Sequence, residues 1–501
     1  MISYATHRHL YWVSSALVFI FFAVVLSGEA PGMFGDSDML WHIAAGDYIR
    51  KIGEVPMLDP WSFTAGDHRW INVAWLWDIA FSYLHEHFGW HGPVVMNAVT
   101  IAITLAILFA HGLLRSGDNL IPIVIALIGV ILMMTVILRP MQVTHLMTAI
   151  WMLILAQHSR GLCSHRWLLV MPPLMLLWVN CHGGFIVGLM ALGFFFTQAW
   201  LTKKKPEAIW LFCIGAACFA ATFINPFGWR VYELHWVMLS IPSKAYISEW
   251  LPLTLSYSTL LLNLLAVIFI LLVPRNNSLN FSHAERWFAY VWLIMGVTSM
   301  RNMSIFAVVA FPLVVAALAQ YLKPSAATPN PTARAIADRC LALLNRKQAA
   351  VSALLASAAL VPFLFSPNAM RWLTIDFKPI SIKSEIAFIE QHIASPRVLN
   401  HYNLGGYLIY ESRGRVPVFV DPRAETIFPS SLMQEYWNFQ SGSQDWDGIL
   451  NRYHINAIMI PNKKTMPGHD RLHGYLAMLP GWRLAFEGPI AVIYVRTDVT
   501  N

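Results

Sequence analysis

The residues best suited to chemistry lie in one polar stretch, Gly35–Trp77, which follows the first apolar segment of the chain. It contains Asp36 and Asp38, closely followed by Trp41 and His42. Hydrocarbon cannot hold so many polar groups at low cost, so we expect the stretch to lie at or outside a membrane face. A carboxylate there can take the proton of an attacking hydroxyl, and Asp38 is the first candidate for this general base, with Asp36 second. Alternatively, Asp36 caps the N-terminus of a short helix.

Cationic and imidazole side chains at the ends of apolar segments could hold a departing phosphate. Arg139 and Arg301 are the main candidates, because a guanidinium binds phosphate through two parallel hydrogen bonds. His182 is a third candidate. Each arginine could instead be an ordinary residue whose charge reaches the interface from the end of a span. All three lie on the same predicted side of the membrane as the acidic stretch, which favours a site open to both water and lipid.

Five further residues are predicted to bind substrate: His42, Trp41, Asp59, Glu249 and Asn180. Asp59 precedes a proline and could simply open a turn. Glu249 stands beside Trp250 and could simply close an outer loop. His42 and His182, together with Asp38 and Glu249, would suffice to bind a divalent metal. No two of these residues share a tight metal-binding motif, however, so the sequence predicts no metal site and no certain cofactor.

The composition is that of an integral membrane protein. Of the 501 residues, 57% are hydrophobic and 12% are charged, whereas soluble proteins have about 25% charged residues. Apolar runs long enough to cross a bilayer recur along the chain. The net charge of +7 therefore reflects membrane topology rather than nucleic-acid binding. The five cysteines are scattered, and no pair has the spacing of a zinc-binding or redox motif. The first apolar run, Tyr11–Leu26, is predicted to be an uncleaved signal anchor.

Hydropathy predicts about eleven membrane spans, with the N-terminus in the cytoplasm. They lie near residues 11–27, 93–113, 120–138, 142–158, 167–180, 184–201, 208–224, 256–273, 286–299, 302–322 and 349–366. The cytoplasmic loops then hold 14 Lys and Arg residues and the outer loops hold 7, which satisfies the positive-inside rule. The large first outer loop covers residues 28–92. Within it, Ile71–Phe88 is predicted to lie on the membrane surface as an amphipathic helix with Asp78 on its wet face.

The chain is predicted to divide into a membrane domain, residues 1–366, and a soluble extracytoplasmic α/β domain, residues 367–501. Short β-forming runs predict strands, and amphipathic runs between them predict helices. The strands are expected near Arg397–Leu399, Tyr407–Tyr410, Val416–Val420, Ala457–Ile460 and Ala491–Val495, and the helices near Ser384–Ile393, Ser431–Phe439 and Leu472–Leu479.

Within this second domain, Gly405 and Gly406 are predicted to form a tight turn before a strand. Asp421 and Arg423 could contact an acceptor or form a local ion pair. The domain offers no nucleophile arrangement and no phosphate loop. It is therefore expected to steer the acceptor or brace the outer loop rather than to be a second enzyme.

Several motifs resemble those of bacterial GT-C-type membrane glycosyltransferases, in the neighbourhood of the polyprenyl-phosphate-mannose-dependent protein mannosyltransferases. The resemblance covers most of the chain and is carried by Asp36–Gly46, Gly53–Pro56, Asp59–Thr64, Asn180–Gly184, Asn225–Gly228, Ser248–Trp250, Arg301-Asn302, Asn403–Tyr407 and Val420–Arg423. Relatives often carry a His-Glu pair where this chain has Val73-Ala74, so any role of that pair is lost or moved.

The resemblance implies a polyprenyl-phosphate-linked sugar as donor, transfer at the outer face of a bacterial inner membrane, and inversion at the anomeric carbon. The acceptor would be a glycan, a lipid or a protein. Two other functions remain open: a glycan ligase or polymerase with a lipid-diphosphate-linked donor, and a lipid or sugar transporter. A transporter would be expected to carry charges inside its spans, and no Lys or Arg falls in the interior of a predicted span, since Arg286 is the first residue of span 286–299.

Overall fold

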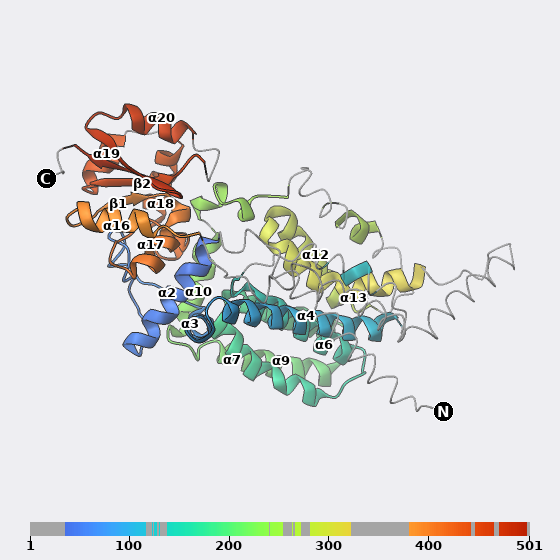
Figure 1. The fold of residues 1–501 in the computed structure, drawn as a ribbon. Helices are drawn as coiled ribbons and strands as arrows, with labels where there is room; N and C mark the ends of the chain where they lie inside the picture. The colour runs from blue at the N-terminus through green and yellow to red at the C-terminus, as the bar shows by residue number, and fades with distance from the viewer. Residues whose placement is uncertain are drawn as a thin grey trace, which may run out of the picture.

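The computed structural model consists of a helical part and a smaller sheet-containing domain at one end of it (Figure 1). It describes residues 36–116, 123, 125–127, 130, 138–239, 241–253, 263, 266–271, 281–321, 380–441, 446–464 and 470–497.

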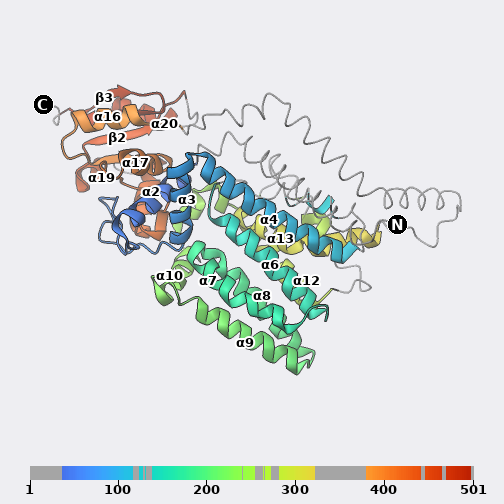
Figure 2. The same cartoon turned by 60° about the horizontal axis from the view of Figure 1, so that its bottom comes forward.

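The helical part is built around α6, which contacts α4, α7, α8 and α13. These helices run roughly alongside one another (Figure 2). The described helices are α2 (Ser37–Ile52), α3 (Trp75–Phe88), α4 (His91–Ser116), α6 (Met141–Ser159), α7 (Met171–Cys181), α8 (Ile186–Leu201), α9 (Lys205–Ala221), α10 (Val231–Leu239), α12 (His283–Thr298) and α13 (Met303–Tyr321). Short 3-10 helices join them: η1 (His165–Val170), η2 (Gly183–Phe185), η3 (Gly228–Arg230), η4 (Pro242–Ala245), η5 (Ser248–Trp250) and η6 (Met300–Asn302).

Three helical segments within the described residues are long and apolar enough to cross a membrane: His91–Ser116, Gly183–Leu201 and Met300–Tyr321. They correspond to the predicted spans 93–113, 184–201 and 302–322. The predicted spans 142–158, 167–180, 208–224 and 286–299 are also largely helical. Spans 11–27 and 349–366, and most of 120–138 and 256–273, lie outside the described residues. The number of eleven therefore stays a prediction.

The first outer loop contributes two helices, α2 and α3, which pack against each other. Close packing is possible because Gly46 of α2 faces the backbone of α3: a Cβ at this position would lie 2.0 Å from the carbonyl oxygen of Asp78. Glycine is therefore required where the two helices meet. The predicted helix at Ile71–Phe88 is confirmed as α3, although it begins at Trp75.

Residues 380–497 contain a mixed four-stranded sheet in the order β1-β2-β4-β3. β1 (Val398–Asn400) pairs in parallel with β2 (Ala457–Pro461), while β4 (Ala491–Arg496) is antiparallel to both β2 and β3 (Trp482–Glu487). The helices of this domain are α16 (Lys383–His392), α17 (Gly405–Ser412), α18 (Ser430–Gln440), α19 (Trp446–Arg452) and α20 (Asp470–Met478), with 3-10 helices η7 (Tyr402–Leu404) and η8 (Ala424–Thr426).

Three of the five predicted strands are confirmed as β1, β2 and β4, and the three predicted helices as α16, α18 and α20. The strand predicted at Tyr407–Tyr410 is wrong, because this run lies in α17. Val416–Val420 forms only isolated bridges, through Val418 to Ser62 and Val398. The edge strand β3 was not predicted, because it is half exposed and does not alternate cleanly between apolar and polar residues.

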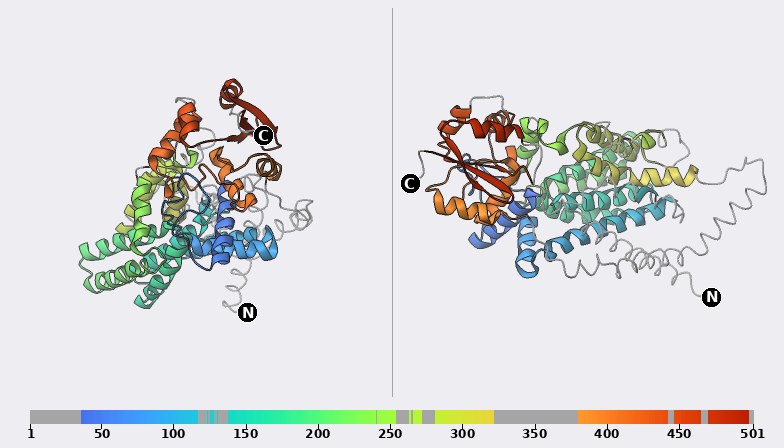
Figure 3. Two further views of the ribbon diagram at one scale, coloured as in Figure 1. Left: turned by 90° about the vertical axis from the view of Figure 1, so that its left-hand side faces the viewer. Right: turned by 45° about the horizontal axis from the view of Figure 1, so that its top comes forward.

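The sheet domain docks on the outer loop through α17, which packs against the start of α2. In Figure 3 the orange and red sheet domain lies next to the blue helices of the outer loop. Gly405 and Gly406 open this helix rather than a turn, which corrects the prediction for both. The backbone N–H of Gly406 donates to the hydroxyl of Ser37 at 3.0 Å. A Cβ on Gly406 would lie 2.0 Å from the carbonyl oxygen of Ser37, so the two helices can approach only where no side chain intervenes.

Replacing Gly406 by Ala is expected to destabilise this contact by about 1–3 kcal/mol, the range for overpacking a tight interface. Gly474 is a matched control because it also lies in a helix, α20, and a Cβ there would meet no atom within 4 Å. Gly474→Ala is expected to be neutral or stabilising by up to about 1 kcal/mol. Thermal unfolding of the purified variants checks both, and equal melting temperatures would contradict the docking described here.

Candidate active site

The start of α2 holds the two acidic residues that the sequence indicated. Asp36 has an extended backbone and caps the helix, its side chain accepting from the N–H of Asp38 at 3.2 Å. The capping role that was an alternative for Asp36 is thus confirmed. Asp38 lies in the first turn of the helix, where the indole Nε1 of Trp41 approaches its Oδ1 at 3.4 Å. The Asp38 side chain is 18% exposed, so it can meet a ligand from outside.

Arg139, just before α6, binds both of these carboxylates. Its Nε and Nη2 contact the two oxygens of Asp36 at 2.6 and 2.8 Å. Its Nη1 lies 2.9 Å from Oδ2 of Asp38. Arg139 and Asp36 are more than 100 residues apart in sequence, and this ion pair fixes the start of α2 against the helical part.

Glu249 and Arg301 complete the group, which we name the acidic cluster: Asp36, Asp38, Arg139, Glu249 and Arg301. Both oxygens of Glu249 lie within 3.4 Å of Nη1 of Arg139. Its Oε1 also lies 3.3 Å from Nη1 of Arg301. The guanidinium of Arg301 stands over the ring of Trp250 at 5.0 Å. Three acids and two arginines give the ionised cluster a net charge of −1.

The electrostatic balance singles out Asp38. Burial, opposed by Arg139 and assisted by Asp36 and Glu249, raises the pKa of Asp38 to about 6. A carboxylate with this pKa is ionised at neutral pH and is a stronger base than an ordinary one, as a general base requires.

This pKa predicts a pH dependence for any reaction in which Asp38 takes a proton. The residue is active when deprotonated, so the rate should fall as the pH drops below about 6, the pKa of Asp38, and level off above it. Measuring kcat/KM between roughly pH 5 and pH 8 checks this. In Asp38→Asn, the residual rate should not show this fall at low pH. The same fall at low pH in both proteins would assign the titration to another group.

His42 and its partner Asp78 are both buried, with 6% of the His42 side chain left exposed. Nδ1 of His42 lies 2.6 Å from Oδ1 of Asp78, whose side chain has no exposed surface. The other oxygen of Asp78 accepts from Nδ2 of Asn72 at 2.8 Å. The prediction that Asp78 lies on a wet face is therefore wrong: α2 packs on this face of α3, and the carboxylate is retained there by hydrogen bonds.

Hydrogen bonds from the backbone and from Thr144 fix the orientation of the His182 ring. The backbone N–H of Gly184 donates to its Nδ1 at 3.0 Å. The hydroxyl of Thr144 lies 2.7 Å from the same nitrogen and itself accepts from Nε1 of Trp178 at 3.0 Å. Because Nδ1 accepts a backbone N–H, it carries no proton, and the proton of the neutral ring is on Nε2. Burial, assisted by the charge of Arg301, lowers the pKa of His182 well below its ordinary value.

Asn180, predicted to bind substrate, has both ends of its amide hydrogen-bonded within the protein. Its Nδ2 donates to the carbonyl oxygens of Leu176 and Ile224 at 2.8 and 3.0 Å. Its Oδ1 accepts from Nε1 of Trp75 at 2.8 Å. The amide is thus used to fix α3 against the end of α7 and the segment after α9.

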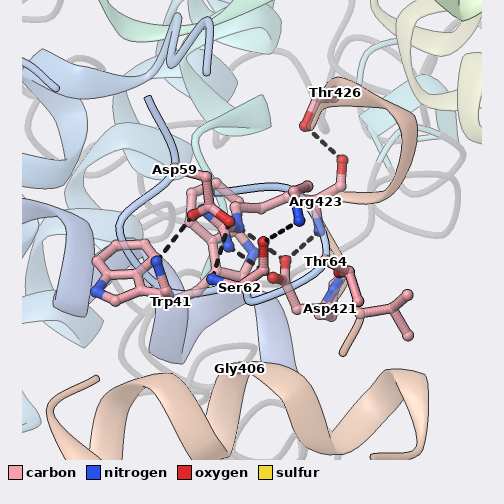
Figure 4. A network of polar contacts seen from close by, with 12 residues as sticks. Trp41, Asp59, Ser62, Thr64, Gly406, Asp421, Arg423 and Thr426 are labelled. Carbon is pink, nitrogen blue, oxygen red and sulfur yellow. Dashed lines mark hydrogen bonds and ion pairs between the residues drawn. The ribbon is translucent and has the colours of Figure 1, made fainter. Parts of the chain in front are cut away.

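For Asp59, the structure confirms the turn that the sequence offered as an alternative to substrate binding. It accepts from the N–H groups of Trp61 and Ser62 and so opens a turn. Its Oδ1 contacts Nη1 of Arg423 at 2.8 Å, and Arg423 binds both oxygens of Asp421 (Figure 4). These ionic side chains are fully buried. The ion pair predicted for Asp421 and Arg423 is confirmed, and it extends to the outer loop.

The donor set of the acidic cluster does not suit a divalent metal. Among the described residues, no three or more His, Cys, Asp or Glu side chains are grouped so that they could hold an ion. The guanidinium of Arg139 already lies between Asp36 and Asp38, and a cation there would have to compete with it.

Sequence reasoning missed Tyr402, which the sheet domain contributes near the cluster. It is 9% exposed and its hydroxyl donates to the carbonyl oxygen of Pro422 at 3.2 Å. Burial, assisted by the charges of Asp38 and Asp421, raises the pKa of Tyr402 well above its ordinary value. Its place before the Asn403–Tyr407 motif was the only available signal.

Comparisons with known proteins find the fold but no sequence relative. No protein-family model matches the chain, and no curated protein matches it. The apo oligosaccharyltransferase of Archaeoglobus fulgidus aligns with a TM-score of 0.52 and 11% identity, over 92% of this chain and 70% of that chain. ArnT from Cupriavidus metallidurans bound to undecaprenyl phosphate aligns with a TM-score of 0.49 and 14% identity, over 98% of each chain. The resemblance seen in the motifs is confirmed at the level of the fold, because this chain shares the fold of the Archaeoglobus fulgidus oligosaccharyltransferase.

Proposed function

We propose that this chain is a glycosyltransferase that moves a sugar from a polyprenyl-phosphate-linked donor to an acceptor on the outer face of a bacterial cytoplasmic membrane. The proposal rests on the acidic cluster, where Asp38 contacts Arg139 and where Arg301 is joined through Glu249, in a GT-C-like fold. Sugar transfer from a lipid phosphate needs a base for the acceptor and positive charge for the leaving group. The cluster holds both within a few ångströms.

In the proposed reaction, Asp38 takes the proton of the acceptor hydroxyl as its oxygen attacks the anomeric carbon. The bond between that carbon and the phosphate oxygen breaks, and the electron pair leaves with polyprenyl phosphate. A single displacement from the opposite side inverts the anomeric centre. Asp36 is less suited to be the base, because it caps α2 and binds Arg139 through both oxygens.

Arg301 is the first candidate for holding the phosphate. Its one ion-pair partner within the described residues is Glu249, at 3.3 Å, so most of its donors can turn to a ligand. Arg139 is bonded to three carboxylates and can reach a phosphate only if Glu249 moves away. His182 offers an uncharged Nε2–H donor near Arg301, and its fixed tautomer suits an anionic oxygen.

The remaining parts of the proposal are its topology and the role of the second domain. The start of α2, with Asp36 and Asp38, lies outside the membrane, and the N-terminus lies in the cytoplasm. The sheet domain is on the same side of the membrane as the acidic cluster. Contacts of α17 with α2 support a bracing role for this domain.

The test is release of polyprenyl phosphate from purified full-length protein in detergent, with a panel of polyprenyl-phosphate sugars. The native chain is expected to release the lipid phosphate from at least one donor and to transfer the sugar with inversion, seen by NMR of the product. Arg301→Lys keeps the charge but loses the bidentate geometry and should bind polyprenyl phosphate more weakly. Release only from diphosphate-linked donors would replace this proposal by a glycan ligase.

A further inference from the structure

The pair formed by His42 and Asp78 is not used by the reaction proposed above. The two residues come from different helices, α2 and α3, and are brought together by the close approach at Gly46. Their side chains are 6% and 0% exposed, respectively. Burying a carboxylate costs free energy unless hydrogen bonds compensate for it, so this pair needs an explanation.

The direction of each bond in this group can be read from the structure. The N–H of Ala74 donates to Oδ1 of Asn72 at 3.1 Å, which fixes the orientation of that amide. Nδ2 of Asn72 must then donate to Oδ2 of Asp78, leaving Oδ1 of Asp78 for His42. An imidazole is more basic than a carboxyl group, so the shared proton is on Nδ1 of His42. In the neutral form of the ring, Nε2 then carries no proton.

Nε2 of His42 is therefore a hydrogen-bond acceptor with no partner among the described residues. The His42 side chain keeps 6% of its surface exposed, and this exposed part is where a hydroxyl group would approach the nitrogen. Its character is opposite to that of Nε2 of His182, which carries a proton and donates.

His42 shares a face of α2 with the proposed base. Asp38 and His42 are four residues apart, one helical turn, so their side chains are neighbours. Trp41 links them: its ring stacks on His42 at 3.6 Å, and its Nε1 approaches Asp38 at 3.4 Å. A molecule whose hydroxyl reaches Asp38 would place its next groups beside His42.

We propose that His42 is an acceptor-binding residue: its Nε2 accepts a hydrogen bond from a hydroxyl of the glycosyl acceptor, and Asp78 is the positioning residue that holds the proton of the neutral ring on Nδ1. This inference rests on the proposed function and adds the chemistry of the acceptor to it. An unprotonated nitrogen repels phosphate and carboxylate, so the acceptor presents hydroxyl groups to α2. In this arrangement His182 binds the phosphate of the donor and His42 binds the acceptor.

The tautomer is tested without any reaction, by nitrogen NMR of the full chain with labelled histidine. The spectrum of His42→Gln, subtracted from that of the native chain, identifies the His42 nitrogens. In the native chain Nε2 is expected to be unprotonated. In Asp78→Asn the new amide N–H can donate to Nδ1, which moves the proton to Nε2. A protonated Nε2 in the native chain overturns the inference.

The binding role is tested by kinetics with an alkyl glycoside as the hydroxyl probe and the best donor of the panel. His42→Ala and Asp78→Asn are expected to lower kcat/KM for the alkyl glycoside by about tenfold to a hundredfold, the loss expected when one hydrogen-bond partner of an uncharged group is removed. Binding of polyprenyl phosphate should stay within about twofold. His42→Gln can keep an oxygen acceptor near the position of Nε2 and should recover much of the loss.

Asp47→Asn is the matched control, because Asp47 also joins α2 to α3, through the hydroxyl of Ser82, but its side chain is 54% exposed. It should behave as the native chain does. Each of three results would overturn the proposal. The first is native-like kinetics in His42→Ala, and the second is weaker binding of polyprenyl phosphate in place of the effect on the acceptor. The third is a His42→Gln variant that is as inactive as His42→Ala. A native chain that releases no lipid phosphate would instead refute the proposed function, and the NMR result would still decide the tautomer.

Discussion

Asp38→Asn is expected to lower the rate of sugar transfer by about 10³-fold, within the range of about 10² to 10⁴ that general-base catalysis contributes. The substitution removes the proton acceptor and keeps the size of the side chain. It also removes one of the three carboxylates that bind Arg139, so polyprenyl phosphate should bind at least as tightly as to the native chain. The measurement is single-turnover release of the lipid phosphate, with donor binding measured separately.

Two other replacements by Asn separate catalysis from structure. Asp67 lies in the same outer loop and is exposed, so Asp67→Asn should leave the rate unchanged. Asp36→Asn keeps a residue that caps helices well but weakens the hold on Arg139, and we expect a loss clearly smaller than for Asp38→Asn. A larger loss in Asp36→Asn, with both proteins folded, would transfer the role of base to Asp36.

The sequence could indicate which residues belong to the acidic cluster, because charges near predicted spans must collect at a membrane face. Asp36, Asp38, Arg139, Glu249 and Arg301 were all candidates, and all five meet. Sequence could not show which charges neutralise each other. Arg139 was predicted to bind phosphate, and in the structure it pairs with carboxylates more than 100 residues away in sequence, which no local pattern records.

The predictions that were wrong have a common cause: another part of the chain buries the segment that was considered alone. Asp78 looked like the wet face of an amphipathic helix because the helix was considered alone, and α2 covers that face. The run Tyr407–Tyr410 looked like a strand because a short, continuously apolar segment fits a buried strand or a buried helix equally well. Both features depend on tertiary contacts between the outer loop and its neighbours.

The same contacts make Arg423 the residue whose loss should cost most stability. Arg423→Met is expected to destabilise the docking of the sheet domain by about 3–5 kcal/mol, because Asp59 and Asp421 would keep their buried charges without a partner. The guanidinium also stands between the rings of Trp61 and Trp70, at 4.8 and 4.9 Å. Thermal unfolding in detergent and limited proteolysis of the outer loop would measure the effect.

Arg452→Met is the matched control, since Arg452 pairs with Glu435 at 2.6 Å but is 63% exposed. An exposed pair contributes about 1 kcal/mol or less. If unpaired charge causes the loss, adding Asp59→Asn and Asp421→Asn to Arg423→Met should restore much of the stability, and an Asn at 59 can still accept from the turn. Equal losses for Arg423→Met and Arg452→Met would show that the buried network does not hold the domain, and that α17 and Gly406 carry the docking alone.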